Sequence, residues 1–226
     1  MAHSSRFIQC ALVLVGLVFL VLQPRAFSAD EAEAVLRGVQ EKYGVLPGLG
    51  VSYTREVITR SMSALGGQLR GDSASGKIFF KAPENVRLEQ KDPREERIVS
   101  DGEVLWWYIP SEEKAYRYSA DEFGKEIGLL ADALRGLREV KKDFHVALIH
   151  HSGEGDAGVE LRPKTEWQEI DRIVVRVDSE GVIEEVEIRN QLGSITRFAL
   201  GPPERIDDFA EGFFRFQPPS GVEGEV

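Results

Sequence analysis

Alternation of apolar and polar residues predicts short β-strands along most of the chain. In GKIFFKAPENVRLEQ, Lys77 and Lys81 share one face of the strand, which leaves Ile78 and Phe80 on the other. After a turn at Pro83, Val86 and Leu88 alternate with charged side chains. This period of two is typical of antiparallel strands with one buried face. Similar patterns, separated by glycine-rich or proline-containing turns, predict strands at 50–61, 99–118 (three strands), 144–150, 158–163, 170–178, 182–190, 194–200 and 213–216.

A second pattern, with apolar residues three and four positions apart, predicts two helices. The first covers 30–43, with acidic residues in its first turn, and is ended by Gly44 and Pro47-Gly48. The second follows a capping box from Ser119 to Glu122 and continues to about residue 138. Its apolar stripe is made of Phe123, Ile127, Leu130, Leu134 and Leu137.

With many strands and few helices, the fold class is predicted to be α+β and mainly β. Such a long sheet has to curl into a barrel or half-barrel to bury its apolar face. No repeat or long linker divides the sequence, so residues 29–226 are predicted to form a single domain.

The first 28 residues have the pattern of a secretory signal peptide. Arg6 precedes an apolar run from Cys10 to Leu22, which is short for a membrane span, and small residues follow. Cleavage is predicted near Ser28 or Ala29. The only cysteine, Cys10, precedes the apolar run, which disfavours lipidation, and its removal leaves no cysteine for a disulfide.

The net charge and the absence of known motifs exclude several classes of function. A net charge of −10 argues against nucleic acid as a partner. The histidines His145, His150 and His151 lie near acidic residues, but their spacing matches no zinc pattern, so neither a metal nor another cofactor is expected. No nucleophile elbow or phosphate-binding loop is present. We therefore expect a protein that is not an enzyme, and we keep a hydrolase using the His150 and His151 region as a less favoured alternative.

The aromatic stretch LWWYI, Leu105 to Ile109, has apolar side chains on both faces of a predicted strand. One apolar face is explained by core packing, whereas two need cover on both sides, as in a curled sheet that holds helices or a ligand. The pattern does not decide which of Trp106 and Trp107 points inward.

Taken together, these blocks resemble the periplasmic outer-membrane lipoprotein carrier family, LolA. The resemblance rests on the order of an N-terminal helix, FFKAPENVRLEQ, IVSDGEVLWWYIPSEEKA, DRIVVRVDSEGVIEEVEIRNQ and the closing FRFQPPSGVE. It implies an unclosed antiparallel β-barrel with a helical lid and an apolar cavity. It also implies a periplasmic chaperone that receives acylated lipoproteins from an inner-membrane ABC exporter of the LolCDE type. The cargo then passes to an outer-membrane receptor of the LolB type, and the carrier is expected to be a monomer.

The resemblance and the strand patterns together predict the site. Acyl chains are expected to contact a set of inward-facing side chains, namely Ile78, Phe80, Val86, Leu88, Trp107, Phe198 and Leu200. The lid is expected to present Phe123, Ile127, Leu130 and Leu134. The family has an arginine in its Lys-Arg-Pro turn that holds the lid closed, but here the turn reads Lys81-Ala82-Pro83, and Arg87 is a candidate substitute. The alternative function is a periplasmic lipid-binding sensor, or a carrier of a different lipid, on the same scaffold.

Overall fold

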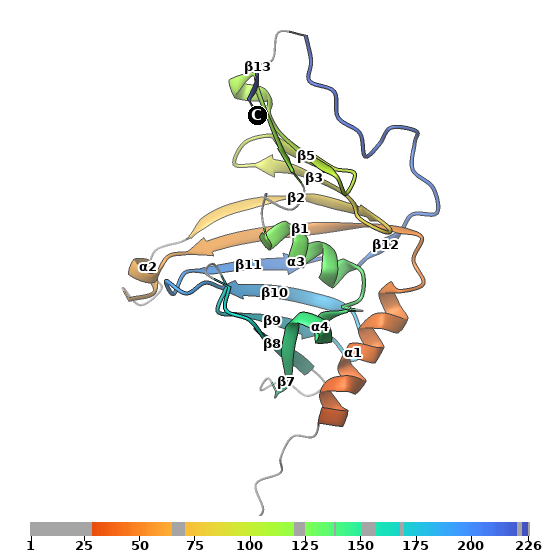
Figure 1. Cartoon of the computed structure of the whole chain (residues 1–226), viewed down its shortest axis with the longest axis vertical. Coiled ribbons are helices and arrows are strands. Elements are labelled where there is room, and N and C mark those ends of the chain that lie inside the picture. The colour runs from red at the N-terminus through yellow and green to blue at the C-terminus, as the bar shows by residue number, and fades with distance from the viewer. Residues whose placement is uncertain are drawn as a thin grey trace, which may run out of the picture.

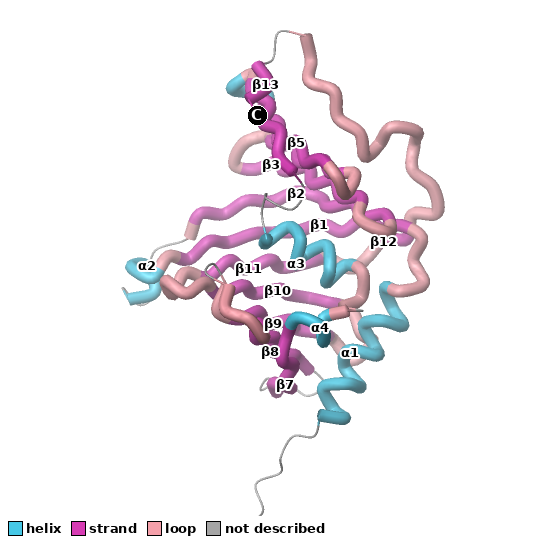
Figure 2. The backbone as a smooth tube through the Cα atoms, in the orientation of Figure 1, coloured by secondary structure: helices cyan, strands magenta, loops and turns pink. Residues whose placement is uncertain are grey.

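The computed structural model of the protein describes residues 29–64, 71–119, 125–137, 139–150, 157–167, 170–220 and 223–225. Within these ranges the strands form one sheet in the order β13-β6-β5-β4-β3-β2-β1-β11-β10-β9-β8-β7, with β12 paired to β1 (Figures 1 and 2). The strands are β1 (Gly48–Ile58), β2 (Asp72–Lys81), β3 (Asn85–Asp92), β4 (Glu96–Ser100), β5 (Val104–Ile109), β6 (Lys114–Ser119), β7 (Phe144–His150), β8 (Ala157–Pro163), β9 (Arg172–Val177), β10 (Ile183–Arg189), β11 (Ile195–Leu200), β12 (Glu204–Arg205) and β13 (Glu223–Glu225). The helices are α1 (Ala29–Tyr43), α2 (Arg60–Ala64), the 3-10 turn η1 (Pro110–Glu112), α3 (Lys125–Leu134) and α4 (Val140–Asp143).

The sheet is antiparallel except for its last pair, in which β13 runs parallel to β6. In the described part of the chain, its terminal strands β7 and β13 do not pair with each other, so the barrel is unclosed. The predicted fold class, mainly β with an unclosed antiparallel barrel, is confirmed. None of the helices in the described ranges is long and apolar enough to cross a membrane.

The inner face of the sheet is the face that carries the hydrophobic core and is covered by α1 and α3. Val51 on β1, Ile78 on β2 and Leu88 on β3 stand opposite one another in register, and all three are buried. The charged and polar residues between them point to the other face, which we call the outer face. The period-two pattern thus places one apolar row on the side of the helices.

Helix α1 packs against the β7–β10 end of the sheet through the predicted apolar stripe. Its last residue, Tyr43, is buried, and its hydroxyl oxygen accepts a hydrogen bond from the backbone N–H of Ile183, at 3.1 Å. Burial, only partly offset by this hydrogen bond, raises the pKa of Tyr43 to about 12. Gly181 has φ +80°, and a Cβ there would lie 2.6 Å from the carbonyl oxygen of Gly38, so the turn before β10 has to be glycine for α1 to approach.

Helix α3 is shorter than predicted. Ser119 is the last residue of β6, and the described helix begins at Lys125; the rest of the proposed capping box lies outside the described residues. At the other end, Gly136 has φ +83°, its N–H donates to the carbonyl of Ala133, and the N–H of Leu137 donates to that of Asp132. This pair of bonds is a Schellman motif, which ends the helix four residues before the predicted end.

The predicted strand at 213–216 is wrong. Residues 211–214 form a turn, in which Gly212 has φ +75°, and the segment crosses the outer face of the sheet instead of pairing with it. Phe213 packs edge-on against Phe79, with ring centroids 5.1 Å apart, and Phe216 packs against Trp106 and Tyr108. The aromatic residues that suggested a strand are therefore covered by ring packing, which leaves Phe213 and Phe216 half-buried. In Figure 1 this segment follows β12 and leads to β13 at the top of the sheet.

Candidate functional site

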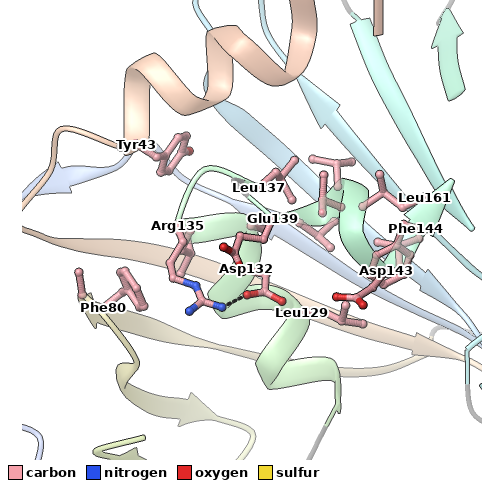
Figure 3. Close-up of a pocket in the computed structure, with 18 of the residues that line it drawn as sticks. Tyr43, Phe80, Leu129, Asp132, Arg135, Leu137, Glu139, Asp143, Phe144 and Leu161 are labelled. Carbon is pink, nitrogen blue, oxygen red and sulfur yellow. Dashed lines mark hydrogen bonds and ion pairs between the residues drawn. The ribbon is translucent and has the colours of Figure 1, made fainter. Parts of the chain in front are cut away.

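A cavity of about 490 Å³ lies between the inner face of the sheet and the helices. Its walls come from the end of α1, the last turns of α3, α4 and strands β7 to β10, with the β2–β3 turn at one side (Figure 3). Its size is within the range of about 300–1,000 Å³ that small-molecule sites occupy. The chain folds this way locally because α3, α1 and the sheet each direct an apolar stripe to the same space.

The floor of the cavity is apolar. It is made by Leu161, Ile173, Val175 and Val186 from the sheet, with Phe144 at the start of β7. All five are buried members of the hydrophobic core. Such a surface favours hydrocarbon by about 25 cal/mol for each Å² of apolar area removed from water.

The mouth of the cavity is polar. Asp132, Arg135, Glu139 and Asp143 line it beside the apolar floor (Figure 3). The hydrogen bond and the charge of Lys142 lower the pKa of Glu139, which lies fully exposed. The site therefore combines an apolar interior with a polar rim of acidic and basic side chains, an arrangement suited to binding a hydrophobic chain whose end stays in water.

Arg135, the first residue after α3, connects the helix to the β2–β3 turn. Its Nη1 donates to the backbone carbonyl of Pro83 at 3.3 Å and lies 3.9 Å from a carboxylate oxygen of Glu84. Its Nη2 pairs with Asp132 on α3 (Figure 3). Pro83, Asp132 and Arg135 all line the cavity, so this bridge forms part of its rim.

The structure brings the predicted acyl-binding residues together on one face, although most of them lie beside the cavity rather than in its wall. Ile78, Val86, Leu88 and Phe198 are buried in the core, Trp107 and Leu200 pack against it, and Phe80 lines the cavity. Their contact with a ligand remains a prediction.

Of the predicted lid residues, Leu134 lines the cavity and Leu130 is buried in the core beneath α3. Phe123 lies outside the described residues, as does the side chain of Ile127. The part of α3 that is described covers the inner face, as predicted for a lid, and Figure 1 shows it in front of the central strands.

The two tryptophans separate as alternation along a strand requires. Trp107 is on the inner face, packs against the core and donates from Nε1 to the carboxylate of Glu96 at 2.8 Å. Trp106 is on the outer face, where its ring packs at a tilt against Phe216, with ring centroids 5.8 Å apart. Both apolar faces of β5 are therefore covered, one by the core and the other by the C-terminal segment.

Arg87 is not placed to hold the lid in this structure. It lies on the outer face, where Nη1 donates to the carbonyl of Phe213 at 2.8 Å and the guanidinium stacks 4.5 Å from that ring. Its remaining contact is an ion pair with Glu89 at 2.7 Å. Ala82 stays exposed at the cavity rim, and the contact between α3 and this turn comes from Arg135 instead.

Of the three histidines, His145 is exposed on β7, while His151 and the side chain of His150 lie outside the described residues. In the described ranges no group of three or more His, Cys, Asp or Glu side chains is placed to hold a metal ion.

Sequence reasoning missed the cavity floor and the Arg135 bridge. The floor residues Ile173, Val175 and Val186 belong to strands predicted correctly, and their same-face spacing was a signal that could have found them. Arg135 gave no such signal, because its partner at Pro83 is distant in sequence.

The fold and the cavity define an open half-barrel that encloses an apolar space under a helix. The sequence matches the profile of the family described as outer membrane lipoprotein carrier protein LolA over residues 66–217, and the chain belongs to this family.

Relatives with this name include a protein of Nitrosospira multiformis, 29% identical over 152 residues, which cover 67% of this chain and 72% of that protein. Another, from Legionella pneumophila, is 25% identical over 210 residues, covering 92% of this chain and 95% of the relative. Both are called outer-membrane lipoprotein carrier proteins. An uncharacterised conserved protein of Thermus thermophilus has a similar fold, with a TM-score of 0.50 and 7% identity over 86% of this chain and 98% of that one.

Proposed function

We propose that the protein is a periplasmic chaperone that binds the acyl chains of lipoproteins in the cavity under α3 and carries them from the inner to the outer membrane. The observation that carries this proposal is the apolar cavity, enclosed by α3 and the inner face, in a chain of the LolA family. The named relatives support the same function.

The chemistry of the site fits a carrier rather than an enzyme. Each buried methylene of an acyl chain contributes about 0.8 kcal/mol, so a short stretch of hydrocarbon supplies reversible affinity without covalent chemistry. At the mouth, Arg135 pairs with Asp132 and Lys142 pairs with Glu139, whereas the floor side chains Leu161, Ile173 and Val175 are apolar.

The route assigned to the cargo follows from the same family. We propose that the protein is exported by its signal peptide and receives acylated lipoproteins from an inner-membrane ABC exporter. It delivers them, as a monomer, to an outer-membrane receptor. Helix α3 is the lid in this proposal, and its opening at the Arg135 bridge admits and releases the acyl chains.

The test compares two adjacent residues in the turn that follows α1. Leu46 is half-buried and lines the cavity, whereas Val45 is 69% exposed and does not. Leu46→Glu places a carboxylate beside the apolar wall, and desolvation of that carboxylate by a bound acyl chain costs several kcal/mol. Val45→Glu adds the same charge in water. Both variants and the wild type are isolated from periplasm, and the bound material is identified by mass spectrometry.

We expect acylated lipoproteins with the wild type and with Val45→Glu, and a loss of at least tenfold with Leu46→Glu at unchanged melting temperature. Equal recovery by all three proteins would place the acyl chains outside this cavity. Recovery of free lipids without lipoproteins would refute the lipoprotein carrier and favour the carrier or sensor of a different lipid.

A further inference from the structure

The turn that ends α3 contains two consecutive residues with a left-handed backbone. Gly136 has φ +83° and Leu137 has φ +54°. Glycine adopts this conformation readily, whereas a residue with a side chain is strained there, because its Cβ approaches the backbone. In the described ranges the only other non-glycine residue with a positive φ is Glu113, which is exposed at the end of η1. Leu137 is therefore the only strained residue of this kind that is buried within these ranges.

Leu137 is also part of the cavity wall. Its side chain is 3% exposed, belongs to the hydrophobic core and lines the cavity (Figure 3). In the sequence it lies between Arg135 and Glu139, both of which line the mouth. A hydrocarbon chain that fills the cavity therefore contacts a wall residue whose backbone is strained. Strained residues are concentrated at ligand clamps and switch regions, because their surroundings have to hold them in place.

Two contacts hold the turn in this conformation. The N–H of Leu137 donates to the carbonyl of Asp132 at 3.0 Å, which is one of the two bonds of the Schellman motif. Gly136 packs directly on α1, where an added Cβ would lie 3.2 Å from the Cα of Gln40 and 3.4 Å from the carbonyl oxygen of Val39. The end of α3 is thus fixed to α1 at residue 136, while the side chain of residue 137 reaches the cavity.

The position of Leu137 makes it a hinge between α3 and α4. Rotation about its N–Cα bond turns α3 relative to α4 and to β7, which is held in the sheet by its pairing with β8. Arg135 is two residues before Leu137 and donates to the carbonyl of Pro83. The same rotation therefore moves Arg135 relative to the Pro83 carbonyl that it binds.

From these observations we propose that Leu137 is a positioning residue that couples filling of the cavity to the orientation of α3. An acyl chain takes the place of the Leu137 side chain against the cavity floor, and the residue returns to a negative φ. The relief of strain then favours the turned position of α3. The inference rests on the proposed function, since it needs an acyl chain in this cavity. It deepens that function by naming the residue through which the cargo acts on the lid.

The experiment compares alanine and glycine at residue 137. Leu137→Ala and Leu137→Gly both remove the side chain, so the two variants differ chiefly in the cost of a left-handed backbone. The control is the same comparison at Gly212 on the outer face, with Gly212→Ala against the wild type. Gly212 has φ +75°, and an added Cβ meets nothing within 4 Å. Affinity is measured by fluorescence anisotropy with a synthetic lipopeptide that carries three palmitoyl chains on its N-terminal cysteine and a dye at its other end.

We expect Leu137→Ala to bind the lipopeptide roughly 5- to 30-fold more tightly than Leu137→Gly, which corresponds to about 1–2 kcal/mol for one left-handed residue. Alanine is strained before binding and relieved by it, whereas glycine has no strain to lose. In urea titrations without lipopeptide, Leu137→Gly is at least as stable as Leu137→Ala, and saturating lipopeptide makes Leu137→Ala the more stable variant. Gly212→Ala lowers the urea midpoint and leaves the affinity unchanged.

The wild type supplies a readout that needs no substitution. The backbone chemical shifts of isotope-labelled Leu137 report the sign of φ by nuclear magnetic resonance. We expect them to change from left-handed to right-handed values when the protein is saturated with lipopeptide.

Equal affinities of Leu137→Ala and Leu137→Gly, or left-handed shifts of Leu137 in the complex, would make Leu137 a packing residue and overturn the inference while the proposed function stands. A gain or loss of affinity in Gly212→Ala as large as the difference at residue 137 would also overturn it, since the effect would then follow global stability. No binding of the lipopeptide by the wild type would refute the proposed acyl-chain carrier, and the inference with it.

Discussion

The Arg135 bridge predicts how α3 opens. The side chain of Arg135 is 36% exposed, and it donates to the carbonyl of Pro83 at 3.3 Å while lying 3.9 Å from Glu84. A hydrogen bond from a charged donor contributes about 1.5 kcal/mol at the lower end of its range, and an exposed ion pair adds little. Because the bridge is partly in water, we expect Arg135→Gln to favour opening of α3 by about 1 kcal/mol, or roughly fivefold.

Hydrogen exchange of the α3 amides measures this change directly. In Arg135→Gln the amides of 129–134 are expected to exchange roughly fivefold faster, while those of α1 keep their rates. The matched control is Asp132→Asn, which removes the ion pair between Asp132 and Arg135 and leaves the bond to Pro83 in place. That variant is expected to change exchange by less than about twofold, since helix pairs three apart contribute about 0.2–0.5 kcal/mol.

The same variant has a functional consequence. If the bridge restrains the lid, Arg135→Gln releases bound palmitate faster than the wild type in a stopped-flow exchange experiment. Unchanged exchange at 129–134 would show that the bridge does not restrain α3. Equal acceleration in α1 and α3 would mean that the substitution lowers global stability instead.

Three further predictions concern the scaffold. Tyr43→Phe leaves the backbone N–H at the start of β10 without its acceptor and lowers the free energy of unfolding by about 1–3 kcal/mol in urea titrations, and an unchanged midpoint would contradict this. Arg87→Met removes the hydrogen bond and ring contact to Phe213, so limited proteolysis is expected to cleave after residue 200 faster than in the wild type; equal cleavage would show that the segment is held by its aromatic contacts alone. Glu187 is 3% exposed, and although burial acts to raise its pKa, hydrogen bonds from Arg197 and a neighbouring arginine lower it below 4.5. Its ionised form therefore stabilises the fold above about pH 4.5, and this contribution is lost as the pH falls through the lowered value. The difference in unfolding free energy between the wild type and Glu187→Gln should narrow from pH 6 to pH 3, and a constant difference would refute the assignment.

The strands of the sheet could be predicted from the sequence because their signal is local. Lys77 and Lys81 take one face and leave Ile78 and Phe80 on the other, Val86 and Leu88 alternate with charged side chains, and the Asp-Gly turn before β5 fixes its hairpin. The aromatic segment near Phe213 also has the pattern of a strand, although it forms no strand in the structure. Its aromatic residues pack on the outer face of a sheet formed by residues more than a hundred positions away, and Arg87 supplies the partner for its backbone.

The cavity depends on curvature, which alternation does not specify. A pattern shows that Val186 and Phe198 share a face, but only the bend of the sheet and the end of α3 decide that Val186 meets open space while Phe198 is packed in the core.

The contact between α3 and the β2–β3 turn could not be predicted for a related reason. Ala82 has no side-chain donor, so the sequence suggested a substitute donor, Arg87, in the strand that follows the same turn. The structure instead places the donor on α3 and the acceptor in the turn. The donor of a hydrogen bond between two elements can lie on either of them, so the residue that holds a lid has to be sought on both of the elements it joins.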